Sequence, residues 1–233
     1  MSTRRKLALA YDPLCKKHRP GPTHPERPER IGACLAGVVE VATAEDIIEC
    51  DPAPVTDSEL TLCHSQAYVD LARREIADGR WCLSTGDTSV CAGSWDAAIA
   101  AVGLALEAVD TVLSGDADVA FCPVRPPGHH ATPSRGMGFC ILNNVAIAVR
   151  YVQRKYKLER VAIIDWDVHH GNGTQEAFYE DPSVFYFSTH QSPLFPGTGR
   201  VDETGKGPGK GTTMNCPVPW GAGREEILGA MRG

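Results

Sequence analysis

The segment from Val161 to Gly173, VAIIDWDVHHGNG, constrains the fold of this chain more than any other stretch. Its first four residues are apolar and mostly β-branched, which is typical of a strand buried on both faces of a parallel sheet. Asp165, Asp167 and His169 follow at alternate positions. If the backbone stays extended there, these side chains point to one side, just beyond the carboxyl end of the strand, where open α/β sheets place their active sites.

The same segment also favours a metal site. A single aspartate or histidine at a strand end is usually a cap or a turn residue. Two aspartates and two histidines after a core strand are costly to bury unless they are paired or bind a metal. Imidazole and carboxylate ligands suit zinc with an open coordination position. Gly171 and Gly173 then allow a sharp turn into the next helix.

Strand and helix patterns alternate along the chain, which predicts an α/β fold with a mostly parallel sheet covered by helices. The strands are expected at 6–11, 119–124, 161–164, 184–188 and 213–218, and the helices at 27–41, 95–113, 143–156, 174–179 and 224–231. We expect Ser94 to cap the helix at 95–113 and an irregular loop to begin at Thr189. With 233 residues and no linker or internal repeat, the economical prediction is one domain over residues 1–233.

A second histidine pair, His129-His130, follows the strand at 119–124 after a stiff Pro126-Pro127-Gly128 turn. If this strand and the Val161 strand are neighbours, both pairs meet at one rim of the sheet. Metal-assisted hydrolysis requires metal ligands, a base for the attacking water, and a group that orients the base. The residues available for these tasks are Asp167 and His169 as ligands, His129 and His130 as acid–base groups, and Asp165 and Asn172 as orienting groups.

Composition excludes several other classes of protein. The net charge of −6 argues against nucleic acid as a direct partner. The nine cysteines are scattered and never spaced C-x-x-C, so they predict neither a zinc finger nor a disulfide framework, and they indicate a reducing, cytoplasmic location. No apolar run is long enough for a secretory signal or a membrane span, so no membrane partner is expected.

Four motifs together resemble the zinc-dependent histone deacetylase family, in its class II and bacterial deacetylase-like amidohydrolase branch. They are RPPGHHA at 125–131, GFCILNN at 138–144, IIDWDVHHGNGTQ at 163–175 and FPGTG at 195–199, preceded by HPERPERI at 24–31. The motifs occur in the family's order and spacing, and the resemblance covers nearly the whole chain. It implies the three-layer arginase/deacetylase fold, with helices on both faces of a mostly parallel central sheet.

The resemblance also implies roles for the site residues. Asp167 and His169 correspond to two of the three protein ligands of Zn²⁺. His129 resembles the buried member of the histidine pair, supported by Asp165. His130 resembles the more exposed general base and acid, and Asn172 stands where relatives carry Asp or Asn.

Substrate and cation sites are implied in the same way. Gly138 and Phe139 resemble one wall of the tunnel that holds an acyl-lysine stem, Phe195 resembles the facing wall, and Asp87 resembles a rim carboxylate that binds the substrate backbone. A monovalent cation, usually K⁺, is implied at a set of five residues: Asp165, Asp167, His169, Ser188 and Thr189.

Two features of the family have no counterpart in this chain. Relatives supply a third zinc ligand from a late aspartate and an oxyanion donor from a late tyrosine. After His190 the only acidic residues are Asp202, Glu203, Glu225 and Glu226, none in the family's context, and no tyrosine follows Tyr186. We therefore expect this chain to be the N-terminal two-thirds of a deacetylase domain, with the C-terminal part missing beyond Gly233.

The leading hypothesis is zinc-dependent hydrolysis of the acetyl amide of N-acetyl-lysine, with an acetylated protein or a small acylated amine as substrate. An acetylpolyamine amidohydrolase is the alternative within the same class. A catalytically incomplete acyl-lysine-binding module is the alternative outside it. A manganese hydrolase of the arginase fold would need more bridging carboxylates. The sequence leaves the oligomeric state open.

Overall fold

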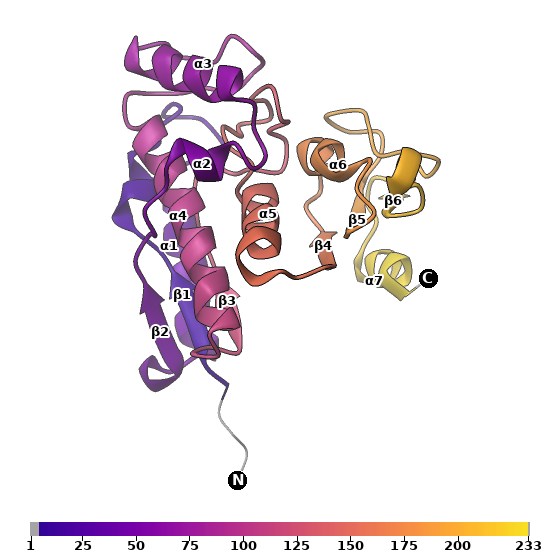
Figure 1. Ribbon diagram of the computed structural model, residues 1–233, viewed down its shortest axis with the longest axis horizontal. Helices are drawn as coiled ribbons and strands as arrows, with labels where there is room; N and C mark the ends of the chain where they lie inside the picture. The colour runs from indigo at the N-terminus through magenta and orange to yellow at the C-terminus, as the bar shows by residue number, and fades with distance from the viewer. Residues whose placement is uncertain (1–4, 233) are drawn as a thin grey trace.

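The computed structural model describes residues 5–232, so Gly233, where the expected truncation falls, lies outside the described residues. Its strands form two three-stranded parallel sheets. The first has the order β2-β1-β3 (Ile47–Cys50, Leu7–Ala10, Val119–Phe121), and the second has the order β4-β5-β6 (Val161–Asp165, Val184–Gln191, Thr213–Val218). In Figure 1 the first sheet belongs to the indigo-to-magenta part of the chain and the second to the orange-to-yellow part.

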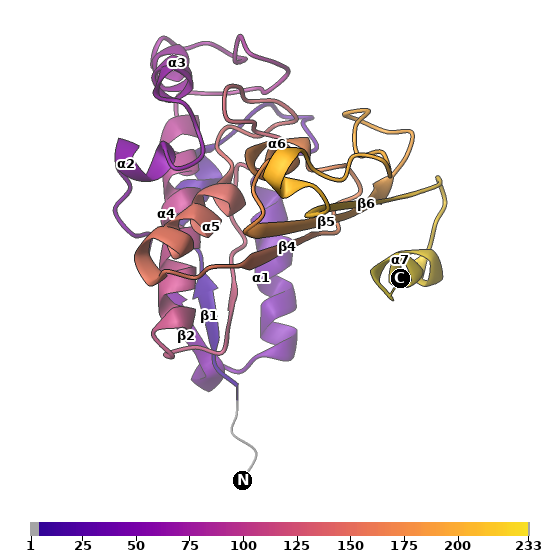
Figure 2. The same ribbon diagram turned by 45° about the vertical axis from the view of Figure 1, so that its right-hand side comes forward.

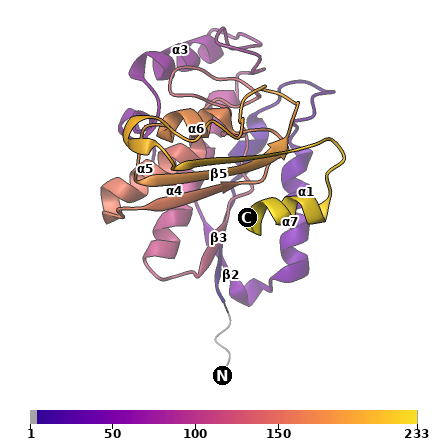
Figure 3. The ribbon, with the colours of Figure 1, turned by 90° about the vertical axis from the view of Figure 1, so that its right-hand side faces the viewer.

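Helices cover both faces of each sheet. Those of the described chain are α1 (Glu29–Val41), α2 (Asp57–Leu60), α3 (Gln66–Ala77), α4 (Ser94–Leu113), α5 (Asn144–Tyr156), α6 (Asn172–Phe178) and α7 (Arg224–Arg232). Figures 1 and 2 show α4 and α1 on opposite sides of β1, and Figure 3 shows α6 and α7 on opposite faces of the second sheet. This arrangement confirms the predicted α/β class. Within residues 5–232, no helix combines the length and apolarity that a membrane crossing requires.

Local predictions differ from the structure at several element ends. The strand β2 was not expected, and residues 189–191 belong to β5 rather than to a loop. Ser94 is the first residue of α4, whose N-cap is Gly93. The Ser94 hydroxyl instead accepts a hydrogen bond from the Cys91 N–H (2.8 Å) and bonds Nδ1 of His18 (2.8 Å). It therefore fixes the preceding loop to the N-terminal segment.

The prediction that β3 and β4 are neighbouring strands is wrong for the described residues. β3 pairs only with β1, and β4 pairs only with β5. A cavity of about 970 Å³ lies between these two edges and is bordered by α4 and α5. The loops after β3 and β4 still meet at one rim, because α4 and α5 pack against each other and hold the two sheets together.

His64, between α2 and α3, links three parts of the core while staying neutral. Its Nε2 accepts a hydrogen bond from the Asn143 N–H (2.9 Å), so its Nδ1–H is the donor to the Thr132 carbonyl (2.9 Å). Asn143 is also the N-cap of α5, where its side chain accepts from the Ala146 N–H. The side chain of His64 is 2% exposed, and burial lowers its pKa to about 4.

We therefore expect acidification to destabilise the protein through His64. The unfolded histidine takes up a proton near pH 6.5 and the folded one only near pH 4, so stability is full above pH 6.5 and falls as the pH drops towards 4. The expected loss from this residue is about 2–3 kcal/mol by pH 4.5. Urea unfolding at pH 7.0 and 4.5 measures it. His64→Gln should show a flatter pH dependence than the wild type, and an unchanged dependence would contradict the assignment.

Candidate active site

The two histidine-bearing loops meet at the rim formed by the carboxyl ends of β3 and β4. The Nδ1–H of His129 donates to Oδ2 of Asp165, at 3.0 Å. The buried Tyr186 hydroxyl, on β5, lies 3.2 Å from the same oxygen and 3.1 Å from the Gly171 carbonyl. Asp165 is thus held from two sides. A Cβ at Gly171 would collide with Asp165, which explains the glycine at this position.

His130 is oriented by a different group. Its Nδ1–H donates to the Asn172 side-chain oxygen (2.9 Å), and the amide nitrogen of Asn172 donates to the Met137 sulfur (3.4 Å). The Nε2 of His130 is therefore left as the acceptor of the ring. Gly138 has a φ of +57° and lies against the His130 ring, so a side chain there would clash with it.

The environments of the two histidines separate their pKa values. Burial lowers the pKa of His129, but its hydrogen bond to Asp165 and the nearby Asp charges outweigh burial and raise it overall. Burial and the neighbouring charge of His129 lower the pKa of His130 to about 4. At neutral pH His130 is therefore a neutral acceptor, and His129 more readily carries a proton. Such a pair suits one acid and one base in the same reaction.

Asp167 and His169 converge beside this pair. Oδ1 of Asp167 lies 3.0 Å from Nδ1 of His169 and 4.0 Å from Nε2 of His129. The two side chains are 47% and 38% exposed, so they are accessible to an ion from solvent. Within residues 5–232, no group of three or more His, Cys, Asp or Glu side chains is placed to hold a metal ion. The structure thus places Asp167 and His169, the two residues expected to bind zinc, side by side.

Of the expected tunnel residues, Phe195 and Gly138 lie against His130, whereas Phe139 and Asp87 have other neighbours. Phe195 lies over His130, with ring centroids 5.0 Å apart, and over His169 at 6.2 Å. Phe139 contacts His24 instead, at 4.4 Å, and has an unusual positive φ of 68°. Asp87 accepts a hydrogen bond from the Gly138 N–H (2.7 Å) and so anchors this strained turn.

Two of the five residues expected to hold a monovalent cation, Ser188 and Thr189, lie on β5 beside Asp165. Ser188 pairs in register with Asp165, and both Ser188 and Thr189 are buried on β5. The Ser188 hydroxyl bonds Nδ1 of His190 (2.9 Å), whereas the buried Thr189 hydroxyl has no hydrogen-bond partner within the described chain. An unsatisfied buried oxygen at this position is consistent with a cation ligand set.

The burial of the histidine pair differs from the expectation. His130 is 4% exposed, whereas the His129 side chain is 18% exposed. The reason is the cavity between β3 and β4, which opens onto His129. His130 is covered by Gly138 and Phe195 on the other side of the pair.

Sequence reasoning missed a buried ionic cluster that supports the first histidine loop. Arg125 donates two hydrogen bonds to Glu26, including Nη2 to Oε2 at 2.6 Å, and one each to the Cys15 and His18 carbonyls at 3.0 Å. Arg125 and Glu26 are 3% and 1% exposed, and Nε2 of His18 lies 3.4 Å from Glu26. The arginine in RPPGHHA, next to two prolines, was the available signal. Its partner lies 99 positions away, so no local pattern identifies it.

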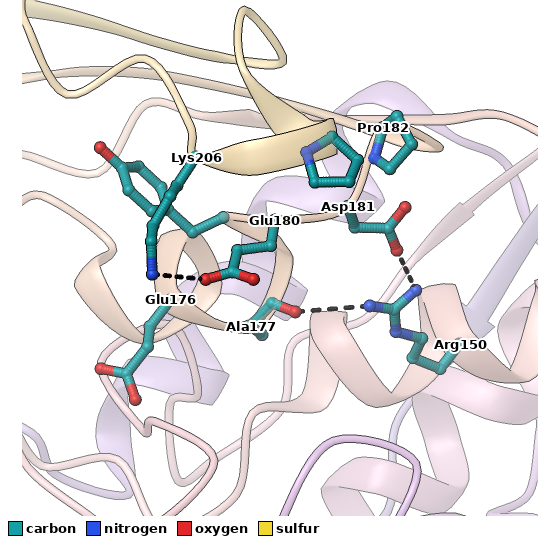
Figure 4. Close-up of a pocket in the computed structure, with 9 residues that line it drawn as sticks. Arg150, Glu176, Ala177, Glu180, Asp181, Pro182 and Lys206 are labelled. Atoms are coloured by element: carbon teal, nitrogen blue, oxygen red, sulfur yellow. Dashed lines mark hydrogen bonds and ion pairs between the residues drawn. The ribbon is translucent and has the colours of Figure 1, made fainter.

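A second hollow, of about 640 Å³, lies away from this rim, between α5, α6 and the 206–208 segment (Figure 4). Two ion pairs line it, Arg150 with Asp181 and Lys206 with Glu180 at 2.9 Å, and the Glu176 side chain lines it as well. Arg150 also lies over the ring of Phe178. We interpret the two ion pairs as contacts that hold α5 and the 206–208 segment against the turn that follows α6.

Comparison with known proteins agrees with the motifs. The profile of the histone deacetylase domain family matches residues 24–233. A probable deacetylase of Archaeoglobus fulgidus is 43% identical over 214 residues, which cover 91% of this chain and 59% of the relative. A histone deacetylase-like amidohydrolase of Pseudomonas aeruginosa is 34% identical and is matched over 64% of its length. The crystal structure of the HDA15 HD domain superposes with a TM-score of 0.83 at 34% identity, covering 95% of this chain and 63% of that one. The chain therefore spans about three-fifths of these proteins.

Proposed function

This chain belongs to the histone deacetylase family, and from that premise we propose that it carries the histidine pair and part of the metal site of a zinc-dependent deacetylase. The reaction is hydrolysis of the acetyl amide of N-acetyl-lysine, or of a similar N-acyl amine. Acetylated proteins and small acylated amines, including acetylpolyamines, share the group on which it acts.

The observation that carries this proposal is that the two histidines have different hydrogen-bond partners and therefore different proton-transfer roles. His130 donates Nδ1–H to Asn172 and keeps Nε2 free to take a proton from an attacking water. His129 is held by Asp165, which raises its pKa, so it can supply positive charge and a proton next to the same attacking water. The ring centroids lie 4.0 Å apart, which is close enough for the two histidines to act on one substrate carbonyl in the proposed reaction.

The donors present fit zinc in part. Asp167 and His169 offer one oxygen and one nitrogen, which are ordinary zinc ligands, whereas catalytic zinc normally has three protein ligands. These two residues would hold the ion together with a further donor that is not found within residues 5–232. Bound zinc would polarise the acetyl carbonyl and acidify a water molecule. Ser188 and Thr189, with Asp165, Asp167 and His169, form the proposed K⁺ site.

Substrate positioning is assigned to the turn at Gly138-Phe139, to Phe195 and to Asp87. The aromatic rings suit the apolar methylene stem of an acylated lysine. Asp87 keeps one carboxylate oxygen on the Gly138 N–H, and its side chain is exposed at the rim, where a substrate N–H can bind.

Hydrolysis of an acetyl-lysine peptide by the 233-residue chain, with added zinc and then with a chelator, tests the proposal. Turnover that needs added zinc and stops with the chelator supports the deacetylase proposal, and it would mean that the further zinc donor and the oxyanion donor are supplied locally or by a second copy of the chain. If a folded sample binds the acetylated peptide but shows no turnover under any zinc condition, the alternative of a catalytically incomplete acyl-lysine-binding module is correct for this chain. The unmodified lysine peptide is the matched control, because it lacks the acyl group and should not bind.

A further inference from the structure

The loop that carries Phe195 is fastened at both of its ends. At its start, the Gln191 N–H donates to the Val168 carbonyl and the Ser192 N–H donates to the Val218 carbonyl, at 2.9 Å each. Phe195 itself is 39% exposed, so burial of its own ring fixes the side chain only weakly. The position of the ring therefore depends on how the loop ends are held.

At the other end of the loop, Gly199 lies between two buried histidines, His170 and His190. The Gly199 N–H donates to Oε2 of Glu203 (3.0 Å), and the Gly199 carbonyl accepts from Nε2 of His190 (3.0 Å). The preceding residue, Thr198, bonds Nδ1 of His170 through its hydroxyl (2.7 Å). Gly199 has a φ of +86°, and a Cβ there would lie 2.5 Å from the His190 ring and 2.6 Å from the His170 ring. A side chain at this position would thus keep the loop away from both histidines.

The hydrogen bonds around His170 are satisfied by one arrangement of protons. Nε2 of Gln175 donates to the Glu203 carboxylate (2.7 Å), which leaves Oε1 of Gln175 to accept from Nε2–H of His170 (3.0 Å). The same oxygen accepts from the Asn215 amide (2.7 Å). Nδ1 of His170 then has no proton and accepts from the Thr198 hydroxyl. His170 and Asn215 are 1% and 3% exposed, and a network whose donors meet acceptors away from water holds its geometry firmly.

This network joins the loop to the residue that follows a proposed zinc ligand. His170 comes directly after His169, whose ring centroid lies 6.2 Å from that of Phe195. The facing wall of the proposed tunnel is anchored separately, because Asp87 accepts from the Gly138 N–H. The distance between the two walls therefore depends on two independent anchors.

We propose that Glu203 and His170 are positioning residues, which hold the 193–199 loop so that the Phe195 ring lies over His130. They act through the loop rather than by contact with a substrate. The assignment of Phe195 to a tunnel wall rests on the proposed function, whereas the position of its ring is measurable without substrate or metal. Loss of either anchor should free this end of the loop, and the ring should leave His130 while the rest of the protein stays folded.

Fluorine NMR of the 233-residue chain, with 4-fluorophenylalanine placed at position 195 alone, tests the proposal. Glu203→Met removes the acceptor for two donors, and Thr198→Val removes the hydroxyl that bonds His170. In each variant we expect the resonance to move at least about half of the way to its position in the urea-unfolded protein, because the loop opens locally. Thr198 is exposed, so Thr198→Val changes little else and should fold. Glu203→Gln keeps an acceptor oxygen and should retain the wild-type resonance.

Asp202→Ala is the matched control, because Asp202 precedes Glu203 in the chain and pairs with the exposed Arg200. It should leave the resonance in place. An unmoved resonance in both Glu203→Met and Thr198→Val, whatever their urea midpoints, would make the network purely structural and overturn the proposal. Displacement in Glu203→Gln as large as in Glu203→Met would overturn it as well.

Binding of an acetyl-lysine peptide separates this inference from the proposed function. Where the wild type binds the peptide, Glu203→Met and Thr198→Val should each weaken binding about fivefold, a loss comparable to that of one neutral hydrogen bond. A wild type that binds no acetylated peptide would contradict the proposed function, and the fluorine resonance would still decide whether the network positions the ring. Unchanged peptide binding with a displaced resonance would instead remove Phe195 from the tunnel wall.

Discussion

Replacing Arg125 with methionine should destabilise this protein by about 3–5 kcal/mol. The substitution leaves Glu26 buried without its charged partner, and the desolvated carboxylate then has only His18 nearby. It also removes the donors to the Cys15 and His18 carbonyls. Such a loss is a large share of the roughly 5–15 kcal/mol by which domains are stable. Equilibrium unfolding in urea measures it.

Two comparisons separate the buried charge from general effects of the substitution. Arg200→Met breaks an exposed ion pair with Asp202 and should cost no more than about 1 kcal/mol. The double variant Glu26→Met, Arg125→Met leaves no unpaired charge and should recover part of the stability lost in the single variant. If the free energy of unfolding of Arg125→Met lies within about 1 kcal/mol of the wild-type value, the cluster does not support the fold as described.

The cluster also bears on the site. Arg125 directly precedes the Pro126-Pro127-Gly128 turn that carries His129. In the same N-terminal segment, His24 contacts Phe139. The segment from residue 12 to 28 therefore links the histidine loop to the proposed substrate tunnel. Replacing Arg125 should disturb both.

The sequence predicts those parts of the site that depend on which residues follow one another along the chain. Asp165, Asp167 and His169 follow a strongly apolar strand, and the second histidine pair follows a stiff proline turn, so their position at strand ends could be inferred. The carboxyl ends of parallel strands lie at one rim of a sheet. The meeting of the two loops was inferred from a wrong strand neighbourhood, and in the structure it is the packing of α4 against α5 that brings them together. The structure brings all of these side chains together.

The features that sequence reasoning missed depend on distant partners. β2 has only four residues and is fixed by its pairing with β1, so its own pattern is too short to indicate a strand. Strand order is also non-local, which is why β3 and β4 were wrongly taken as neighbours. Tyr186 was given no role from the sequence, yet its hydroxyl reaches Asp165 on the adjacent strand.

Removing the Asp167 carboxylate should abolish most zinc binding by this chain. Asp167 and His169 are the two converging donors, and Asp167→Ala leaves a single half-exposed imidazole, which holds zinc weakly. We expect the affinity to fall at least about a hundredfold, since loss of a direct ligand should exceed the 10–100-fold effect of a supporting one. Zinc content after dialysis and competition with a chromophoric chelator measure the change.

Asp202→Ala is the control for this experiment, because it also removes an exposed aspartate but one that pairs with Arg200. It should bind zinc as the wild type does. Equal zinc binding by Asp167→Ala and the wild type would place the ion elsewhere. His129→Ala gives a further distinction: His129 lies 4.0 Å from Asp167 and bonds Asp165, so its loss should leave most zinc binding intact if it serves as an acid–base group. A loss as large as that of Asp167→Ala would instead make His129 a ligand and remove it from the proton-transfer pair.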